Sequence, residues 1–423
     1  MSLPLNKRDF DIFLSHAHKD EQFVSGLYRW LTEKAGFSVW YDSRELSAGA
    51  KLATDLQRGI ERCRSIFIIL TEESVSRGWV KNEYNSAMDE RANNTDFRVV
   101  ALRLVGADTK ELMKGITWIE FPEERIDTDT AYAITRAYYP GEKLPNPATA
   151  RDIYISRSWH VDNSASARKV CEVLAKEGFR LIGDAKDQRG FTEGDRVQRI
   201  IASCGAFVGI IPYRDEARAR SDSGQYKYIL REMDFASSLG LPSVIIADPR
   251  VSREDGPDQF WYRMDTNATK CPASVDTVLQ NLWENWRKPP QPQYIFLAMD
   301  LASKAAAAGG PIRQLIERIT GMPTVVGNEI FGTQIQTALR DKICQAFVVI
   351  ADITDDNLNT CIEAGMALAA GTNVELLTAG KPRRPPFMLR DLQMPAYEDE
   401  VELIGIIHSI SRRYRRRILN AEI

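Results

Sequence analysis

Three glutamates are the residues of this chain whose type and spacing suggest chemistry. Glu83, Glu232 and Glu363 each stand near the start of a stretch with helical periodicity, and each is followed four residues later by an alanine. A glutamate at a helix start is commonly found there because the helix dipole favours negative charge at that end. A lone carboxylate can also stabilise a sugar that becomes cationic while its glycosidic bond breaks. The elements that position the glutamates bear on which of these two interpretations applies.

The chain divides into three segments of similar size, separated by two proline-rich stretches, YYPGEKLPNPATARD and RKPPQPQ. Proline at this density disfavours helix and sheet and gives a stiff connector. In each segment, apolar strand-like runs alternate with helix-period stretches. This alternation predicts an α/β fold of three tandem doubly wound, flavodoxin- or Rossmann-like parallel-sheet units, over residues 1–140, 150–286 and 292–423. Because ligands of such sheets bind at the carboxyl ends of the strands, the three glutamates are predicted to lie at the functional rim.

The composition restricts the classes of partner. The formal net charge of −3 argues against broad binding to nucleic acid or to an anionic membrane. No apolar run approaches the ~20 residues of a membrane span, and the first residues lack the apolar core of a signal peptide, so a cytoplasmic chain is expected. The six cysteines show no metal-ligand spacing and histidine is scarce, so neither a metal site nor a resident cofactor is predicted. The basic run Arg412–Arg417 is interpreted as a solvated helix face, with an anion or partner site as the alternative.

The first segment resembles the TIR domain. The resemblance rests on FLSHAHKD for the first strand and its loop, VWYD followed by ELSAG for the BB loop, IERCRSIFIILTEESVSRGW for the following strand region, and WVKNE for the catalytic helix. Some TIR domains only assemble, whereas others cleave the nicotinamide N-glycosidic bond of NAD+ and need a glutamate on this helix. The resemblance therefore implies that Glu83 is catalytic and that NAD+ is the substrate rather than a cofactor. One carboxylate without a histidine partner suffices for this reaction, because the nicotinamide is cationic in NAD+ and leaves as a neutral group.

Other residues of the first segment are expected to line the substrate pocket or an interface. Trp79 precedes Glu83 by one helical turn, where an aromatic ring can pack against the site. In TIR domains the BB loop contacts a neighbouring subunit and gates the site, so self-association is implied. The expected substrate-binding residues are Phe13, Ser15, His16, Trp40, Asp42, Ser43 and Trp79, although core packing is the favoured interpretation for Trp40.

The middle segment also looks like a TIR-type unit, but the match is patchy. It keeps an opening strand, a glycine-containing loop and the Glu232 helix, with Tyr228 in place of the tryptophan. It is interpreted as a degenerate unit used for regulation or assembly, with a second active unit as the alternative.

The last segment is similar to nucleoside 2-deoxyribosyltransferase-like proteins. Its motifs are a strand that ends in ADIT, a loop with an asparagine, and a helix with EAGMA. The matching polar residues are Asp352, Thr354, Asn359 and Glu363, and Glu363 stands where that family has its nucleophile. A clear first substrate loop is missing, so a pocket that senses a nucleotide-like ligand is the preferred interpretation over catalysis, and a plain structural helix start remains open.

Together these features predict an NAD+ hydrolase effector of bacterial antiphage defence. A nucleotide-like signal on the C-terminal half is expected to drive oligomerisation and so to activate the TIR domain. The alternatives are a TIR adaptor without catalysis, a TIR cyclase with a cyclic ADP-ribose-type product, and a nucleoside-processing enzyme that acts through Glu363.

Overall fold

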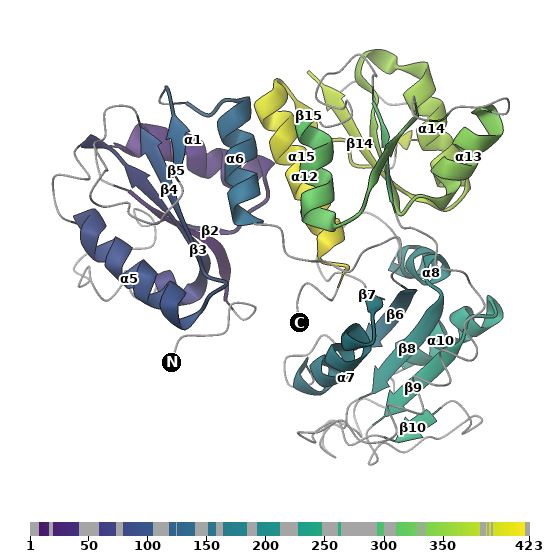
Figure 1. Cartoon of the computed structure of the whole chain (residues 1–423). Helices are drawn as coiled ribbons and strands as arrows, with labels where there is room; N and C mark the ends of the chain where they lie inside the picture. Colours follow the sequence, from purple (N-terminus) through teal and green to yellow (C-terminus); the bar gives the residue numbers. More distant parts are fainter. Residues whose placement is uncertain are drawn as a thin grey trace. The chain divides into compact units, whose positions relative to one another are not determined.

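The computed structural model contains three parallel β-sheets with alternating helices (Figure 1). It describes residues 8–16, 20–41, 59–72, 79–104, 118–123, 125–139, 151–157, 164–183, 193–211, 227–247, 261–263, 294–299, 310–327, 330, 335–380, 386, 389–390 and 392–418. All strand pairs with a described register are parallel. The predicted fold class is therefore confirmed.

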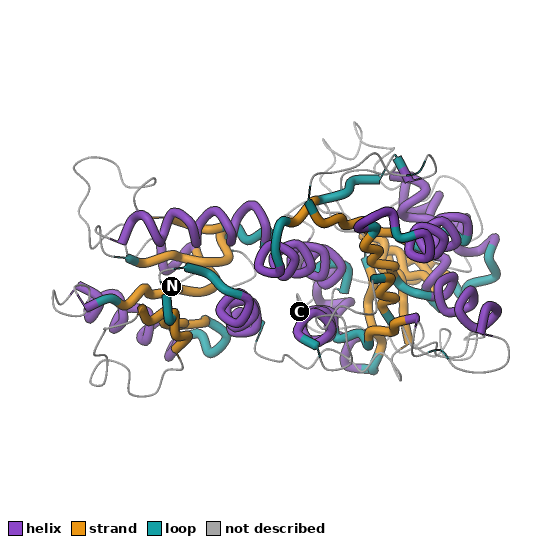
Figure 2. Tube along the Cα trace, turned by 90° about the horizontal axis from the view of Figure 1, so that it is seen from above, coloured by secondary structure: helices purple, strands orange, loops and turns teal. Residues whose placement is uncertain are grey.

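The first sheet has the strand order β2-β1-β3-β4-β5, which is the flavodoxin-like order. Helices lie on both sides of its strands (Figures 1 and 2). Its strands are largely buried because parallel strands covered on both faces are apolar throughout. The elements are β1 (Phe10–Ser15), α1 (Glu21–Arg29), the π-helical turn η3 (Trp30–Lys34), β2 (Val39–Tyr41), β3 (Cys63–Leu70), α5 (Trp79–Asn93), β4 (Arg98–Leu104), β5 (Trp118–Phe121) and α6 (Thr128–Tyr138).

The second sheet repeats this order as β7-β6-β8-β9-β10. A buried ion pair joins its first two strands, since Arg180 donates to both carboxylate oxygens of Asp152 at 2.6 and 2.7 Å. The elements are β6 (Arg151–Arg157), α7 (Ser164–Lys176), β7 (Phe179–Ile182), α8 (Glu193–Ser203), β8 (Ala206–Ile211), α10 (Lys227–Ser238), β9 (Ser243–Ala247) and β10 (Trp261–Arg263).

The third sheet has the order β12-β11-β13-β14-β15, again the same plan. The elements are β11 (Ile295–Ala298), α12 (Pro311–Thr320), β12 (Thr324–Val326), α13 (Ile335–Gln345), β13 (Val348–Asp352), the 3₁₀ turn η8 (Thr354–Asp356), α14 (Leu358–Ala369), β14 (Asn373–Ala379), β15 (Ala396–Tyr397) and α15 (Glu400–Arg415). The recurrence of one strand order in all three sheets supports the interpretation as repeats of one plan.

Contacts within the chain define two compact units that do not coincide with the three sequence segments. The first unit comprises residues 1–142, 308–319 and 395–411, and the second comprises residues 143–307, 320–394 and 412–423. The first unit thus combines the first sheet with most of α12 and of α15. The predicted boundaries at 1–140, 150–286 and 292–423 remain predictions, although each sheet lies inside one of them.

The basic C-terminal run is not a solvated helix face, which corrects the expectation from the sequence. Arg412, Arg415 and Arg417 are buried. The reason is that this end of α15 is built into the second unit: Arg413 and Tyr414 donate to the two carboxylate oxygens of Glu375 at 2.6 and 2.9 Å.

Candidate functional site

Helix α5 carries Glu83 directly after the region that follows β3. Positions four residues apart share one face of a helix, so position 83 lies on the same face as Ala87. Ala87 is fully buried in the core of the first sheet, where Tyr84 and Met88 also pack. The helix therefore places position 83 on its sheet-facing side, one turn closer to the carboxyl end of the strands. The side chains of Trp79 and Glu83 lie outside the described residues.

The glutamate–alanine spacing has the same structural basis in all three sheets. Ala87, Ala236 and Ala367 are each fully buried. A small residue at this point lets the helix approach the sheet closely. Glu232 and Glu363, one turn earlier on their helices, are half-buried, which is the arrangement expected at a rim.

The end of β1 brings two of the predicted residues close to Tyr41. Ser15 is buried as the last residue of β1, and the ring of His16 stacks on the ring of Tyr41 with centroids 5.0 Å apart and planes at 19°. The Tyr41 ring also lies 5.2 Å from that of Tyr28. Both Ser15 and His16 are thus at the carboxyl end of the strands. Asp42 and Ser43 lie outside the described residues.

Phe13 and Trp40 lie deeper, in the core of the first sheet. Their ring centroids are 4.8 Å apart, and both side chains are buried. Gly59 makes room for the indole, because a Cβ atom at that position would lie 1.9 Å from the Trp40 ring. This position agrees with the core role favoured for Trp40. Contact of either ring with a substrate remains a prediction.

A tightly bonded loop follows β13 in the third sheet. Thr354 donates its backbone N–H to the Asp352 carboxylate at 3.1 Å, and its hydroxyl accepts from the Ala379 N–H at 2.8 Å. Asp355 has a φ of +55°, a backbone conformation that residues other than glycine adopt infrequently. These two hydrogen bonds hold Asp352 and Thr354 in a defined loop at the carboxyl end of β13.

Helix α14 begins with a cap that the sequence reasoning missed. The Asn357 side chain accepts from the N–H groups of Asn359 at 3.1 Å and of Thr360 at 3.3 Å, which is an N-cap. The signal was present, since an asparagine directly before an apolar-periodic run predicts a cap. The predicted ligand residue Asn359 is exposed in the first turn.

Glu363 lies beside the end of β12. Burial raises the pKa of its carboxyl to about 7. Gly327 borders this carboxylate, because a Cβ atom at position 327 would lie 3.5 Å from Glu363 Oε1. The sequence reasoning missed Gly327, as nothing in the local pattern links it to a residue 36 positions away. A carboxyl group with a pKa near neutrality can both donate and accept a proton at physiological pH.

The residues that the structure describes contain no group of three or more His, Cys, Asp or Glu side chains that could hold a metal ion. Among the helices that the structure describes, none combines the length and the apolar character needed to cross a membrane.

Comparison with known proteins places the first sheet in a family. The family model described as "TIR domain" matches residues 12–135. A probable 2′ cyclic ADP-D-ribose synthase, TcpO, of Methanobrevibacter olleyae is 34% identical over 83 residues, which is 19% of this chain and 24% of that protein. An NAD(+) hydrolase, TcpA, of a Theionarchaea archaeon is 32% identical over 114 residues, 26% of this chain and 33% of that protein. A 2′ cyclic ADP-D-ribose synthase, BtTIR, of Bacteroides thetaiotaomicron is 26% identical over 91 residues, 22% of this chain and 32% of that protein.

These similarities concern only part of each protein. The chain spans about a quarter to a third of the length of these relatives. The resemblances of the middle and last segments therefore stay predictions. Residues 12–135, with β1 to β5 and the Glu83 helix, are a TIR domain.

Proposed function

We propose that the TIR domain cleaves the bond between nicotinamide and ribose in NAD+, with Glu83 as the catalytic residue. One observation carries the proposal: the segment that matches the TIR domain holds Glu83 on α5, one turn before the buried Ala87, on the sheet-facing side of the helix. The relatives described above are named as an NAD+ hydrolase and as cyclic ADP-ribose synthases, so the same class of bond is the proposed target here.

The chemistry suits a single carboxylate. The C1′–N bond breaks, its electron pair goes to the pyridinium nitrogen, and nicotinamide leaves as a neutral molecule. The ribose acquires oxocarbenium character, which the Glu83 carboxylate stabilises electrostatically. Water then adds to C1′ and loses a proton, so the products are nicotinamide, ADP-ribose and H+. In the cyclase alternative, a hydroxyl of the same ADP-ribose takes the place of water.

We further propose that the last segment controls this activity. Uncontrolled cleavage would exhaust the cell's own NAD+, so the enzyme needs a switch. The ordered loop of Asp352 and Thr354, with Asn359 and Glu363 on the following helix, offers polar groups for a nucleotide-like signal. Binding of that signal is proposed to promote self-association of TIR domains, and antiphage defence in a bacterial cytoplasm is the proposed setting.

A second candidate function places chemistry at Glu363 itself. Its half-buried carboxyl, with a pKa of about 7 and a glycine beside it, is an arrangement compatible with a nucleophile or a general acid–base on a nucleoside. In this alternative the third sheet makes or breaks an N-glycosidic bond, and the TIR domain assembles.

Nicotinamide release from NAD+ tests these functions. The purified full chain is incubated with NAD+, alone and with candidate nucleotides, and nicotinamide, ADP-ribose and cyclic product are followed by chromatography. The variants are Glu83→Gln, Glu363→Gln and, as the matched control from the second sheet, Glu232→Gln. Each change removes one charge with little change of shape.

The outcomes separate the candidates. We expect Glu83→Gln to lower release at least 100-fold and Glu232→Gln to leave it unchanged. Loss of release with Glu363→Gln alone would move the chemistry to the third sheet. Ordered assembly without release under every nucleotide tried would identify an adaptor. The ratio of linear to cyclic product distinguishes a hydrolase from a cyclase.

A further inference from the structure

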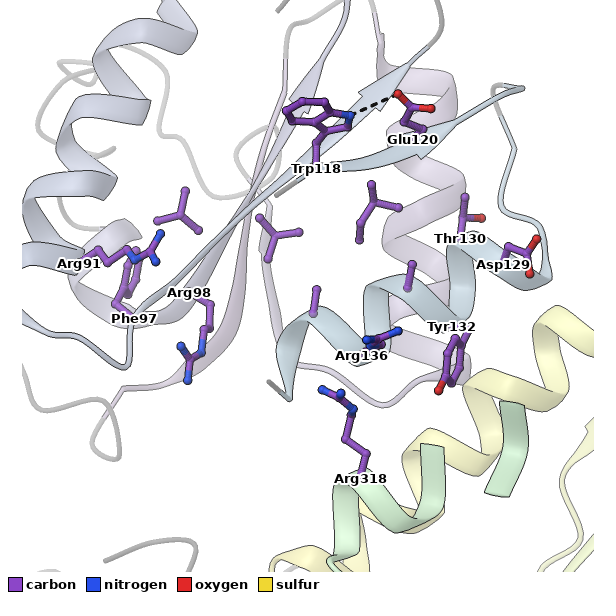
Figure 3. A pocket seen from close by; sticks show the side chains of 15 residues that line it. Arg91, Phe97, Arg98, Trp118, Glu120, Asp129, Thr130, Tyr132, Arg136 and Arg318 are labelled. Atoms are coloured by element: carbon purple, nitrogen blue, oxygen red, sulfur yellow. Dashed lines mark hydrogen bonds between the residues drawn. The ribbon is translucent and has the colours of Figure 1, made fainter. Parts of the chain in front are cut away.

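A positively charged groove lies beside β4 and β5 in the first unit (Figure 3). Its volume is about 770 Å³, within the range of small-molecule sites. The strands β4 and β5, the helices α5 and α6, and Arg318 of α12 form its walls. All these residues belong to the first compact unit.

Four arginines line this groove: Arg91, Arg98, Arg136 and Arg318. Within the described part of the chain, Arg91, Arg98 and Arg136 take part in no ion pair and no side-chain hydrogen bond. Arg318 donates from Nη1 to the Tyr139 carbonyl at 2.8 Å and keeps its other donors. Figure 3 shows Arg98, Arg136 and Arg318 gathered at one end of the groove.

The carboxylates of the groove do not neutralise this cluster. The lining contains two: Figure 3 shows Glu120 beside Trp118 and Asp129 in the first turn of α6. Glu120 is already paired with Arg103 at 2.8 Å. Although the net charge of the chain is −3, this groove contains guanidinium groups without a carboxylate partner among the described residues. Guanidinium groups that line a groove can bind the oxygens of a phosphate.

An aromatic surface lies along the same groove. Trp118 is 40% exposed, and its Nε1 donates to Glu120 at 3.2 Å, which orients the indole. Trp118 pairs in register with Ala101, three residues beyond Arg98 on β4, so the two positions are about 10 Å apart along the strands. The guanidinium of Arg103 lies over the Trp118 ring at 5.7 Å. An indole that remains exposed offers stacking area to a planar ring.

The groove is separate from the candidate catalytic rim. Arg91 lies in the last turn of α5, whereas Glu83 lies near its start, eight residues or about 12 Å earlier along the helix axis. Arg98 is the first residue of β4, so the arginine end lies at the amino ends of the strands. A ligand here would not occupy the position proposed for the ribose of NAD+.

We propose that this groove binds a nucleotide, with its phosphates on Arg98, Arg136 and Arg318 and its base against Trp118. The site goes beyond the proposed function, because it does not involve Glu83 or the last segment's loop. Its ligand would contact α12, a helix more than 170 residues beyond α6 in the sequence. Binding would therefore hold two distant parts of the chain together in one unit.

Calorimetric titration of the full chain tests the site with ATP, ADP, GTP, adenosine and inorganic phosphate as probes. We expect saturable binding of at least one of the three nucleotides, with adenosine and inorganic phosphate at least tenfold weaker. Replacement of both Arg98 and Arg136 by Gln should lower the nucleotide affinity at least tenfold. Trp118→Leu should weaken nucleotide binding but not phosphate binding.

Control variants fix the place of binding. Arg125→Gln removes an exposed arginine that pairs with Glu123 at 2.6 Å outside the groove, and it should leave the affinity unchanged. The nucleotide binding that depends on Arg98 and Arg136 should persist in Glu83→Gln and in Glu363→Gln, which separates the groove from the two candidate sites above. Binding that is lost in either of these two variants belongs to those sites and not to the groove. Thermal unfolding checks that each variant is folded. If the double variant does not fold, the single variant Arg136→Gln replaces it, because the Arg136 side chain is exposed and its loss should not disturb the fold.

Three results would overturn the proposal. The first is no saturable binding of any of the three nucleotides. The second is an affinity for them that the folded arginine variants retain. The third is adenosine or inorganic phosphate binding as tightly as the nucleotides. Equal binding of adenosine would mean that the arginines do not hold the phosphates, and equal binding of phosphate would mean that Trp118 does not hold the base.

Discussion

Glu363 illustrates what partial burial does to one carboxyl group. Its side chain is half-buried at the carboxyl end of the third sheet, beside Gly327. Removal from water disfavours the charged form, and burial is the cause of the raised pKa. The group is thus held neutral in the folded chain over a pH range in which it ionises in the unfolded chain.

The stability of the chain should therefore fall as the pH rises past this group. Below pH 4.5 the carboxyl is protonated in both states, so the chain keeps its full stability there. Between pH 4.5 and about 7 the folded state binds more protons than the unfolded state, so the free energy of unfolding decreases as the pH rises. Glu363→Gln keeps the neutral shape, and we expect it to be more stable than the parent by about 1–2 kcal/mol at pH 8, after allowance for solvent screening. Urea unfolding at pH 5 and pH 8 measures the difference, which should nearly vanish at pH 5.

The control for this effect is Glu177→Gln, which removes an exposed carboxylate directly after the last residue of α7. It should change the unfolding free energy by less than about 0.5 kcal/mol at either pH. An equal pH dependence in the parent and in Glu363→Gln would show that the carboxyl is solvated in the folded chain.

At the scale of elements, the local sequence pattern predicted the strands and helices, but it did not predict which distant residues come together in space. Apolar strand-like runs identified β1, β6, β11 and the buried strands β3, β8 and β13, because strands covered on both faces are apolar throughout. The sequence showed an alanine four residues after each glutamate, and the structure explains this spacing, because each alanine is buried against its sheet. The groove of Arg98, Arg136 and Arg318 could not be found this way, since its residues come from three elements far apart in the sequence.

The burial of the alanine in α14 predicts a cost for a larger side chain. Ala367 is fully buried in the core of the third sheet, and a leucine there would push α14 away from the strands. We expect Ala367→Leu to lower the unfolding free energy by about 1–3 kcal/mol, as overpacking does. The matched control is Ala369→Leu, an exposed position at the end of the same helix, which should change it by less than about 0.5 kcal/mol. Similar losses for both variants in urea unfolding would mean that α14 does not pack through Ala367.

At the scale of the whole molecule, the first compact unit includes a late part of the sequence. Residues 395–411 belong to it, and α15 contacts η3. The Trp30 indole donates to the Val401 carbonyl at 3.0 Å, and Lys34 pairs with Glu402 at 2.9 Å. These contacts span more than 360 residues. Local periodicity carries no information on such pairings, which is why the sequence suggested three separate segments.

Two helix glycines test this arrangement, because the structure predicts opposite signs for the same substitution. Gly405 on α15 packs against η3: a Cβ atom there would lie 2.8 Å from Lys34 Cβ and 3.2 Å from Trp30 Nε1. Gly26 on α1 is exposed, and a Cβ atom there meets nothing within 4 Å. Alanine is the better helix former by about 1 kcal/mol, so Gly26→Ala should stabilise the chain by up to that amount.

Gly405→Ala gains the same helix propensity, but the new methyl group would clash with the Cβ atom and the backbone of Lys34, which would have to move. We expect a net loss of about 1–3 kcal/mol, measured as a lower midpoint of thermal unfolding than in the parent, with a raised midpoint for Gly26→Ala. If Gly405→Ala raised the midpoint as Gly26→Ala does, the space around position 405 would be open in solution. The packing of α15 on η3 would then not hold, and neither would the assignment of residues 395–411 to the TIR-containing unit. Because α12 joins that unit with α15, such a result would also weaken the case that Arg318 completes the nucleotide groove.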